Sequence, residues 1–337
     1  MADHILELKD LTIHFETNDG VFQAVNHIDL SLERGTALGL VGETGAGKTT
    51  TALGIMNLVR TPPGKIVSGE VIFNGEDLLK KNKSAMRKIR GEKISMIFQD
   101  PMTALNPIET VGDQIGEVIR LHQKCSRLEA AKKAGELLEM VGIPADRASD
   151  YPHQFSGGMK QRVVISIALA CKPDLIIADE PTTALDVTIQ AQILQLLHDL
   201  RNELNMSMIL ISHDLGVISE CCDFVAVMYA GSIMEYGKID RIYENMAHPY
   251  TIRLFNALPN IEEDSERLTP IPGLMPDPSN LPSGCPFWTR CANHLPECEK
   301  TMPTFKEIEK DHFVRCHLHN MGLLEGNNSS EGRTSDE

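Results

Sequence analysis

The stretch Gly42–Thr49, with the sequence GETGAGKT, decides the fold of this chain. It fits the pattern G-x-x-x-x-G-K-[ST], with a short apolar run (36–41) before it and a predicted helix (49–59) after it. Glycines here allow a loop whose N–H groups surround phosphate oxygens, and the helix start adds a favourable dipole. In such a loop Lys48 reaches the β- and γ-phosphates of a nucleotide, and Thr49 ligates Mg²⁺. We therefore expect these residues to bind nucleotide: Gly42, Glu43, Thr44, Gly45, Ala46, Gly47, Lys48, Thr49 and Thr50.

Two carboxylates, Asp179 and Glu180, follow an apolar strand predicted over 174–178. We expect Asp179 to hold Mg²⁺, directly or through water. Glu180 is expected to act as the base or polarising group for an attacking water. Such a pair on its own could be a charge cluster at a strand end, but a phosphate-binding loop upstream favours the functional interpretation.

A second anion site is predicted in residues 155–162, FSGGMKQR. Ser156, Gly157 and Gly158 lie at the start of a predicted helix (158–170), so a hydroxyl and backbone N–H groups face one point. A single chain seldom needs two such sites for one triphosphate. The economical solution is a head-to-tail dimer, in which the second site of each chain closes on the nucleotide of the other. The alternative is an ordinary serine N-cap followed by a glycine pair.

Two further polar residues end predicted strands. Gln99 follows the strand 94–98 and opens a helical segment, so it can contact Mg²⁺ or the attacking water and sense movement of that segment. His213 follows the strand 207–211, where its imidazole can contact the γ-phosphate. A lone histidine is usually a surface residue, but one at a strand end beside a phosphate loop indicates function.

Strands and helices alternate over most of the chain, which predicts a mostly parallel α/β sheet. Between 101 and 151 the apolar spacing is helical instead, which predicts an all-helical insertion. The predicted strands are 5–15, 25–32, 36–41, 71–73, 94–98, 174–178, 207–211 and 224–229. The predicted helices are 49–59, 111–122, 127–141, 158–170, 187–204 and 215–221.

The composition limits the possible partners. The chain has 337 residues, 32 Lys+Arg and 47 Asp+Glu, so its formal net charge is −15. An acidic chain does not coat nucleic acid non-specifically, and we expect no nucleic-acid partner. No uncharged apolar run approaches the ~20 residues that span a bilayer, and the start of the chain lacks the pattern of a signal peptide. We therefore expect that the chain does not cross a membrane by itself.

These motifs, in this order, resemble the ATP-binding-cassette (ABC) family over residues 5 to about 235. They match Walker A (42–49), the Q-loop (Gln99), the signature (156–161), Walker B (175–179, then Glu180), the D-loop (184–186) and the switch histidine (His213). The resemblance implies that ATP binding joins two cassettes and that hydrolysis lets them part. It also implies site roles: Glu180, His213 and Gln99 as catalytic residues; Thr49, Gln99 and Asp179 at Mg²⁺; and Ser156, Gly157, Gly158 and Gln161 at the nucleotide.

The family also stacks an aromatic side chain on adenine. Phe15 is the first choice for this role and Phe22 the second, and their spacing from the phosphate loop does not decide between them.

The C-terminal part is similar to the extension of dipeptide and oligopeptide importer ATPases. The similarity lies in HPYT (248–251), a proline-rich segment (259–282) and clustered cysteines, together with QDPMTALNP (99–107) and PTTALDV (181–187). It implies an ATPase on the cytoplasmic face of the membrane that pairs with a second ABC ATPase, the same or different. Its other partners would be two membrane permeases and an extracytoplasmic peptide-binding protein. The helical insertion would receive the permease.

Two other functions are alternatives. One is an importer ATPase for another solute, such as nickel or an oligosaccharide, because related extensions serve these solutes and the cassette carries no substrate pocket. The other is a soluble ABC protein that acts on nucleic acid or ribosomes. The chain has one cassette, no sustained heptads and no basic run, which disfavours the second alternative.

The late cysteines have the spacing Cys285-x5-Cys291-x6-Cys298-x17-Cys316. Four thiolates can bind Zn²⁺ or hold an iron–sulfur cluster, and the absence of a C-x2-C pair argues against an ordinary zinc ribbon. The resemblance to the importer branch implies a [4Fe–4S] cluster. Zinc, and free thiols or disulfides, remain the alternatives. A structural role, stapling a segment without its own core, is the simplest one.

These predictions combine into one organisation. The fold class is α/β: an ABC-type P-loop ATPase core with a helical subdomain, plus an irregular, metal-binding C-terminal extension. We expect a RecA-like core at 1–99 and 158–236 and the helical subdomain at 100–157. The C-terminal extension is expected at 237–321, and a disordered tail at 322–337.

Overall fold

The computed structural model describes residues 3–183, 185–256 and 271–323. Its centre is an eight-stranded sheet in the order β11-β12-β10-β9-β3-β8-β7-β6. Neighbours from β9 to β6 are parallel, whereas β10, β11 and β12 pair antiparallel. The strands are β3 (Ala37–Val41), β6 (Ile94–Ile97), β7 (Leu175–Asp179), β8 (Ser207–Ile211), β9 (Phe224–Tyr229), β10 (Ser232–Lys238), β11 (Lys306–Glu309) and β12 (His312–Val314).

A second, antiparallel sheet has the order β2-β1-β4-β5. Its strands are β1 (His4–Thr17), β2 (Gly20–Glu33), β4 (Gly64–Phe73) and β5 (Glu76–Asp77). Helix α1 (Lys48–Ile55) packs between the two sheets, and one apolar cluster joins Leu11 and Ile13 of β1 to Ala52 of α1 and Leu38 of β3. Gly54 packs closely here, since a Cβ at this position would lie 2.6 Å from the Ile13 Cδ1 atom. The predicted helix ends early, because Asn57 has a positive φ of 49°.

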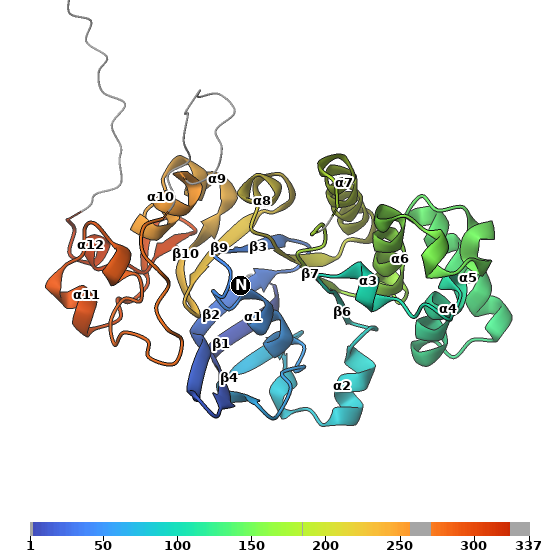
Figure 1. Ribbon diagram of the computed structural model, residues 1–337, viewed down its shortest axis with the longest axis horizontal. Helices are drawn as coiled ribbons and strands as arrows, with labels where there is room; N and C mark the ends of the chain where they lie inside the picture. The colour runs from blue at the N-terminus through green and yellow to red at the C-terminus, as the bar shows by residue number, and fades with distance from the viewer. Residues whose placement is uncertain (1–2, 184, 257–270, 324–337) are drawn as a thin grey trace, which may run out of the picture.

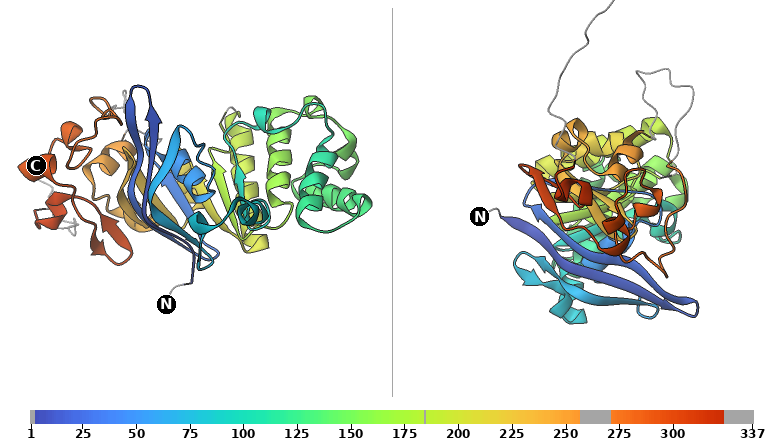
Figure 2. Two further views of the ribbon diagram at one scale, coloured as in Figure 1. Left: turned by 90° about the horizontal axis from the view of Figure 1, so that it is seen from below. Right: turned by 90° about the vertical axis from the view of Figure 1, so that its left-hand side faces the viewer.

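A group of helices forms one end of the molecule, opposite the C-terminal helices (Figures 1 and 2). The helices predicted over 111–122 and 127–141 are present as α4 (Val111–His122) and α5 (Arg127–Met140). Thr110 caps α4, and Ser126 and Glu129 form a capping box at α5. The other helices of the core are α2 (Lys83–Ile89), α3 (Pro101–Ala104), α6 (Gly157–Leu169), α7 (Val187–Leu204) and α8 (Leu215–Cys221).

The C-terminal extension is more regular than expected. It contains α9 (Ile239–Glu244), α10 (Pro249–Asn256), α11 (Pro296–Lys300) and α12 (His317–Asn320), and its hairpin β11–β12 adds two strands to the central sheet. Glu235 of β10 and His312 of β12 are both fully buried and lie 2.7 Å apart, from Oε1 to Nε2. The prediction of irregular structure was wrong for this hairpin, because its strands are short and one buried position carries a histidine instead of an apolar residue.

The HPY stretch at the start of α10 is part of the core. His248 is fully buried, which lowers its pKa to about 4, and its Nδ1 accepts a hydrogen bond from the backbone N–H of Tyr250. The N–H groups of Ala247 and His248 both donate to the Glu235 carboxylate. The stretch therefore joins the extension to the sheet. The predicted disordered tail lies outside the described residues from 324 onward.

Membrane-crossing segments were searched within 3–183, 185–256 and 271–323. No helix there is both long enough and apolar enough to cross a bilayer.

Candidate functional site

The phosphate loop lies between β3 and α1, as the sequence predicts. Gly42 and Gly47 have positive φ values of 149° and 101°. A Cβ at Gly42 would lie 2.2 Å from the Met228 carbonyl oxygen, and one at Gly47 would lie 2.4 Å from the Ala24 carbonyl oxygen. Only glycine fits both positions, which explains their place in the motif. Thr44, Gly45 and Thr49 are exposed, whereas Ala46 is buried and Glu43 and Thr50 are partly buried.

Lys48 lies beneath this loop. Its Nζ donates to the carbonyl oxygens of Gly42, at 2.7 Å, and Glu43, at 3.1 Å. Burial lowers the pKa of Lys48, while the nearby carboxylates of Glu180, Asp179 and Glu43 act in the opposite direction. The ammonium is thus held among acidic groups, where it can move to an incoming phosphate.

The predicted Mg²⁺ residues Thr49 and Asp179 are in contact. The Thr49 hydroxyl donates to Asp179 Oδ1 at 3.1 Å, and Asp179 lies at the buried end of β7. Burial raises the pKa of Asp179, and the Thr49 hydrogen bond opposes this rise. A hydroxyl and a carboxylate side by side are the oxygen ligands that Mg²⁺ takes beside substrate phosphates. These two residues fit the ion.

The other predicted catalytic residues, Gln99 and His213, lie beside the Glu180 carboxylate. Its Oε2 accepts hydrogen bonds from Gln99 Nε2 and from the Thr183 hydroxyl, both at 3.0 Å, and lies 3.6 Å from His213 Nδ1. Glu180 has a positive φ of 44°, unusual outside glycine, and its N–H donates to the Ile211 carbonyl. The backbone thus holds one carboxylate where β6, β7 and β8 end. Thr183 was not predicted, although it follows Glu180 closely in the chain.

The signature segment lies at the start of α6, away from α1 (Figure 1). Ser156 caps the helix, with its hydroxyl accepting from the Met159 N–H, and Ser156 and Gly157 are exposed. A Cβ at Gly158 would lie 2.6 Å from Ile189 Cγ2 of α7, so close packing requires a glycine there. Gln161 is fully buried, and its amide has no hydrogen-bond partner among the residues that the structure describes. The structure therefore presents the first two residues on the surface but not Gln161.

The two candidate aromatic residues lie opposite each other. Phe15 of β1 pairs with Phe22 of β2 in the antiparallel register, and both are partly buried. Side chains at paired positions share one face of a sheet. The choice between Phe15 and Phe22 thus stays open.

Two residues of the C-terminal extension reach the phosphate loop, and the sequence analysis missed both. The Tyr250 hydroxyl accepts a hydrogen bond from the Glu43 N–H at 2.9 Å. Arg290 forms an ion pair with the Glu43 carboxylate, with Nη1 2.7 Å from Oε2. Only the position of Arg290 beside Cys291 in the cysteine motif could have drawn attention to it.

The four late cysteines lie near one another in the extension. All four are free thiols, and three of them are buried: Cys285, Cys298 and Cys316. Burial raises the pKa of Cys285 to about 12, and the nearby sulfurs of Cys298, Cys316 and Cys291 add to this rise. In the described part of the chain, no group of three or more His, Cys, Asp or Glu side chains is arranged to hold a metal ion. The metal-binding character expected for the extension is therefore not supported by the structure.

Fold and site together define a nucleotide-binding cassette. The family model for ABC transporters matches residues 25–183. The model for the oligopeptide/dipeptide transporter C-terminal region matches residues 234–298. Among solved structures, the ATP-binding cassette MJ0796, described as a dimeric post-hydrolysis state with ADP and Pi, aligns with a TM-score of 0.63. It is 28% identical, and the alignment covers 69% of this chain and 98% of that one.

Curated relatives match nearly the whole chain. The oligopeptide transport ATP-binding protein OppD of Bacillus subtilis is 49% identical over 93% of this chain and 88% of its own length. The dipeptide transport protein DppD of the same organism is 46% identical over 94% and 95%. OppD of Escherichia coli is 47% identical over 90% of this chain and 90% of its own length. The chain belongs to the ABC transporter family, among its oligopeptide and dipeptide transport ATP-binding proteins. It is an ATPase coupled to transport.

Proposed function

We propose that this chain hydrolyses ATP to drive the import of oligopeptides or dipeptides through separate membrane permeases. The observation that carries the proposal is the meeting of Gln99, Thr183 and His213 at the Glu180 carboxylate, beside the Thr49–Asp179 contact. The match of residues 234–298 to the peptide-transporter C-terminal region supports peptides as the substrate. ATP-driven uptake of a peptide by liposomes that hold the assembled transporter tests this function.

In the proposed mechanism the phosphate loop holds the triphosphate. Lys48 leaves the carbonyl oxygens of Gly42 and Glu43 and binds the β- and γ-phosphates, while Thr49 and Asp179 hold Mg²⁺ and Gln99 approaches it. When bound there, Mg²⁺ would supply positive charge that offsets the charge developing on the phosphate oxygens. Glu180 orients and deprotonates the attacking water, and His213 contacts the γ-phosphate. The remaining loop residues, and Phe15 or Phe22 at adenine, complete the binding site.

We propose that two cassettes pair head to tail, so that Ser156, Gly157 and Gly158 of one close on the nucleotide of the other. The exposure of Ser156 and Gly157 in the single chain supports this pairing. Gln161, which the resemblance also assigns to the nucleotide, is fully buried in the single chain. The partner is a second ABC ATPase, either a copy of this chain or a related one.

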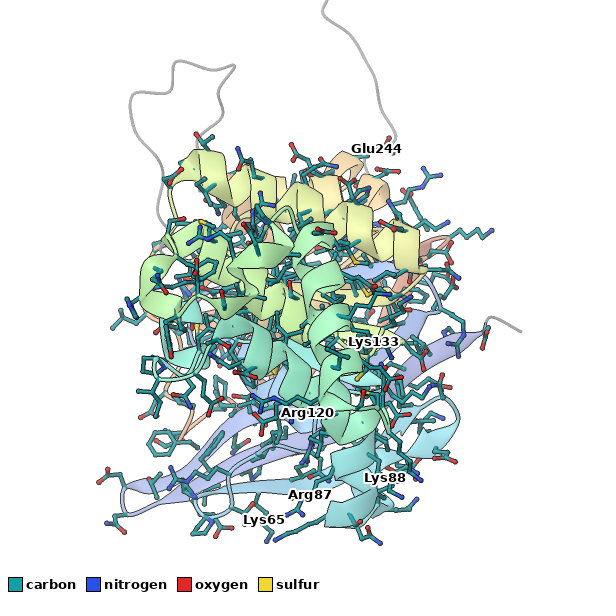
Figure 3. All side chains as sticks on the ribbon, turned by 90° about the vertical axis from the view of Figure 1, so that its right-hand side faces the viewer. Lys65, Arg87, Lys88, Arg120, Lys133 and Glu244 are labelled. Atoms are coloured by element: carbon teal, nitrogen blue, oxygen red, sulfur yellow. The ribbon has the colours of Figure 1, made fainter. Side chains whose placement is uncertain are left out.

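We propose that the helical end receives the permeases, which places the chain on the cytoplasmic face of the membrane. A groove between α4 and α5 is lined by small residues, among them Gly112, Gly116 and Ala130, and by charged residues such as Arg120 and Arg127. Ile108 and Leu128 are 81% and 83% exposed, and exposed apolar residues beside a groove are typical of a protein interface. Figure 3 shows this end, with Arg120 on α4 and Lys133 on α5. An extracytoplasmic binding protein would deliver the peptide to the permeases.

Nickel or an oligosaccharide is the alternative solute. The names of the matching relatives favour peptides over this alternative.

We propose that Cys285, Cys291, Cys298 and Cys316 hold a [4Fe–4S] cluster, with Zn²⁺ as the alternative. The free thiols of these cysteines and their mutual proximity support this proposal. Burial raises the pKa of Cys316 to about 11, so a thiolate at this position requires a nearby positive charge. When bound, the cluster would supply iron–thiolate bonds that join the proline-rich segment to the hairpin. Iron would replace the thiol protons, and the free energy of this binding would stabilise the folded extension.

Metal analysis tests the cluster. Protein purified without oxygen is expected to contain about four irons and four acid-labile sulfides per chain, with a visible iron–sulfur absorption. Cys291→Ser is expected to lose most of this iron, whereas Cys125→Ser, which alters a cysteine outside the cluster, keeps it. One zinc without iron, or no metal at all, would contradict the proposal.

A further inference from the structure

Arg290 of the extension forms hydrogen bonds with Glu43 and Tyr229 of the ATPase core. Its side chain is 4% exposed. Nη1 and Nη2 donate to the two carboxylate oxygens of Glu43, at 2.7 and 3.2 Å. Nη1 also donates to the Tyr229 hydroxyl, Nη2 to the Ile271 carbonyl and Nε to the Pro272 carbonyl. Each of the five N–H donors of a guanidinium can therefore have a partner here.

The extension holds Glu43, the second residue of the phosphate loop, by both its side chain and its backbone. Arg290 holds the Glu43 carboxylate, while the Tyr250 hydroxyl accepts from the Glu43 N–H. Nearby, a Cβ at Gly45 would lie 3.3 Å from the Met275 methyl group of the proline-rich segment. The extension thus covers the start of the loop that the ATPase core uses for phosphates.

The charge on Glu43 works against nucleotide binding. Its carboxylate lies near Lys48, whose ammonium we assign to the β- and γ-phosphates, and its charge opposes the lowering of the Lys48 pKa by burial. A free carboxylate at this distance would repel a triphosphate, because both carry negative charge and burial weakens screening. A bidentate guanidinium cancels that charge in a fixed geometry.

The position of Arg290 is set by the turn between Cys285 and Cys291. The N–H of Trp288 donates to the Cys285 carbonyl, that of Arg290 to Phe287, and that of Cys291 to Trp288. Arg290 also lies over the Tyr229 ring, 5.7 Å from its centroid, beside the aromatic pair of Tyr229 and Phe287. The guanidinium therefore reaches Glu43 only when the turn between the first two cysteines is folded.

We propose that Arg290 is a positioning residue for ATP binding. By neutralising Glu43 within the phosphate loop, it makes the ATP affinity of the core depend on the folded C-terminal extension. The inference rests on the proposed function, in which this loop is the ATP site.

A double-mutant cycle on the intact chain tests the inference. Arg290→Gln is expected to weaken ATP binding about tenfold, because it leaves the Glu43 carboxylate uncompensated beside the phosphates. Glu43→Gln alone is expected to bind ATP more tightly than the wild type, because it removes the repelling carboxylate and leaves the Arg290 charge in place. In the double variant, Glu43→Gln is expected to restore most of the lost affinity. The measurements are the dissociation constant by calorimetry and KM and kcat for ATP, with the loss confined mainly to KM.

The cycle separates a charge effect from loss of structure. A merely structural role for Arg290 would leave the double variant as weak as Arg290→Gln or weaker, and this result would overturn the inference. Arg241→Gln removes an exposed arginine of the same region, 3.6 Å from Glu244, and is expected to leave ATP binding unchanged. If Arg290→Gln does not fold, Arg290→Lys replaces it. This variant keeps the charge but loses the bidentate geometry, so a loss of ATP affinity is expected that Glu43→Gln restores, and a loss that Glu43→Gln does not restore would contradict the inference.

The measurements distinguish a wrong role for Arg290 from a wrong assignment of the phosphate loop. If the wild-type chain binds ATP and Arg290→Gln binds it equally well, only the role of Arg290 is wrong. If the wild-type chain does not bind ATP, or Lys48→Ala binds it unchanged, the assignment of the phosphate loop itself is wrong.

Discussion

Glu180→Gln is expected to lower steady-state ATP turnover by at least about a hundredfold while ATP still binds, because a general base contributes on this scale. The glutamine oxygen can still accept hydrogen bonds from Gln99 and Thr183, so the local geometry is retained. An amide cannot take a proton from the attacking water. The variant should therefore accumulate as a closed dimer with ATP trapped between two cassettes.

Two measurements check this expectation. Phosphate release gives the turnover, and size-exclusion chromatography with and without ATP gives the dimer. Glu244→Gln, which alters an exposed glutamate on α9, serves as the matched control and is expected to behave as the wild type. Wild-type turnover in Glu180→Gln would show that the assigned role is wrong.

Lys48→Ala is expected to weaken ATP binding about a hundredfold, or about 2.7 kcal/mol. The substitution removes the ammonium that bridges the loop carbonyls and would bridge the phosphates. It also removes the cation that interacts with the carboxylates of Asp179 and Glu180. Repulsion between these groups and the triphosphate adds to the loss.

Calorimetry with ATP measures the affinity directly. Lys83→Ala, which removes an exposed lysine at the start of α2, is the control and should bind ATP as the wild type does. Unchanged affinity in Lys48→Ala would reject the phosphate-loop assignment.

Much of the site follows from the sequence because its residues lie at the ends of neighbouring parallel strands. Gln99, Glu180 and His213 each follow a short apolar run, and parallel strands bring such ends to one edge of a sheet. The order β8-β7-β6 then places them together at Glu180. Local patterns suffice here, since each pattern spans only a few residues.

The link between Arg290 and Glu43 could not be predicted in this way. The two residues are separated by 247 positions, and neither has a local pattern that points to the other. The hairpin β11–β12 was missed for a similar reason: it pairs with β10 far away in the chain, and the buried contact of His312 with Glu235 joins the two strands. Long-range polar contacts of this kind leave no periodic signal in the sequence.

Gln161 shows the limit of a motif. The segment 156–161 indicates the start of a helix and a phosphate-facing turn, but not which side of the helix each residue occupies. Five residues after Ser156, the side chain of Gln161 is fully buried. Packing, which the motif does not encode, decides its position.

Transport by the assembled complex tests the central claim most directly. The complex would be isolated through a tag on this chain from membranes of its own cells and reconstituted into liposomes with ATP inside and the binding protein outside. The account predicts that a labelled tripeptide accumulates only with ATP and that Glu180→Gln abolishes the accumulation. Uptake of nickel or an oligosaccharide but no peptide, or peptide uptake unaffected by Glu180→Gln, would contradict it.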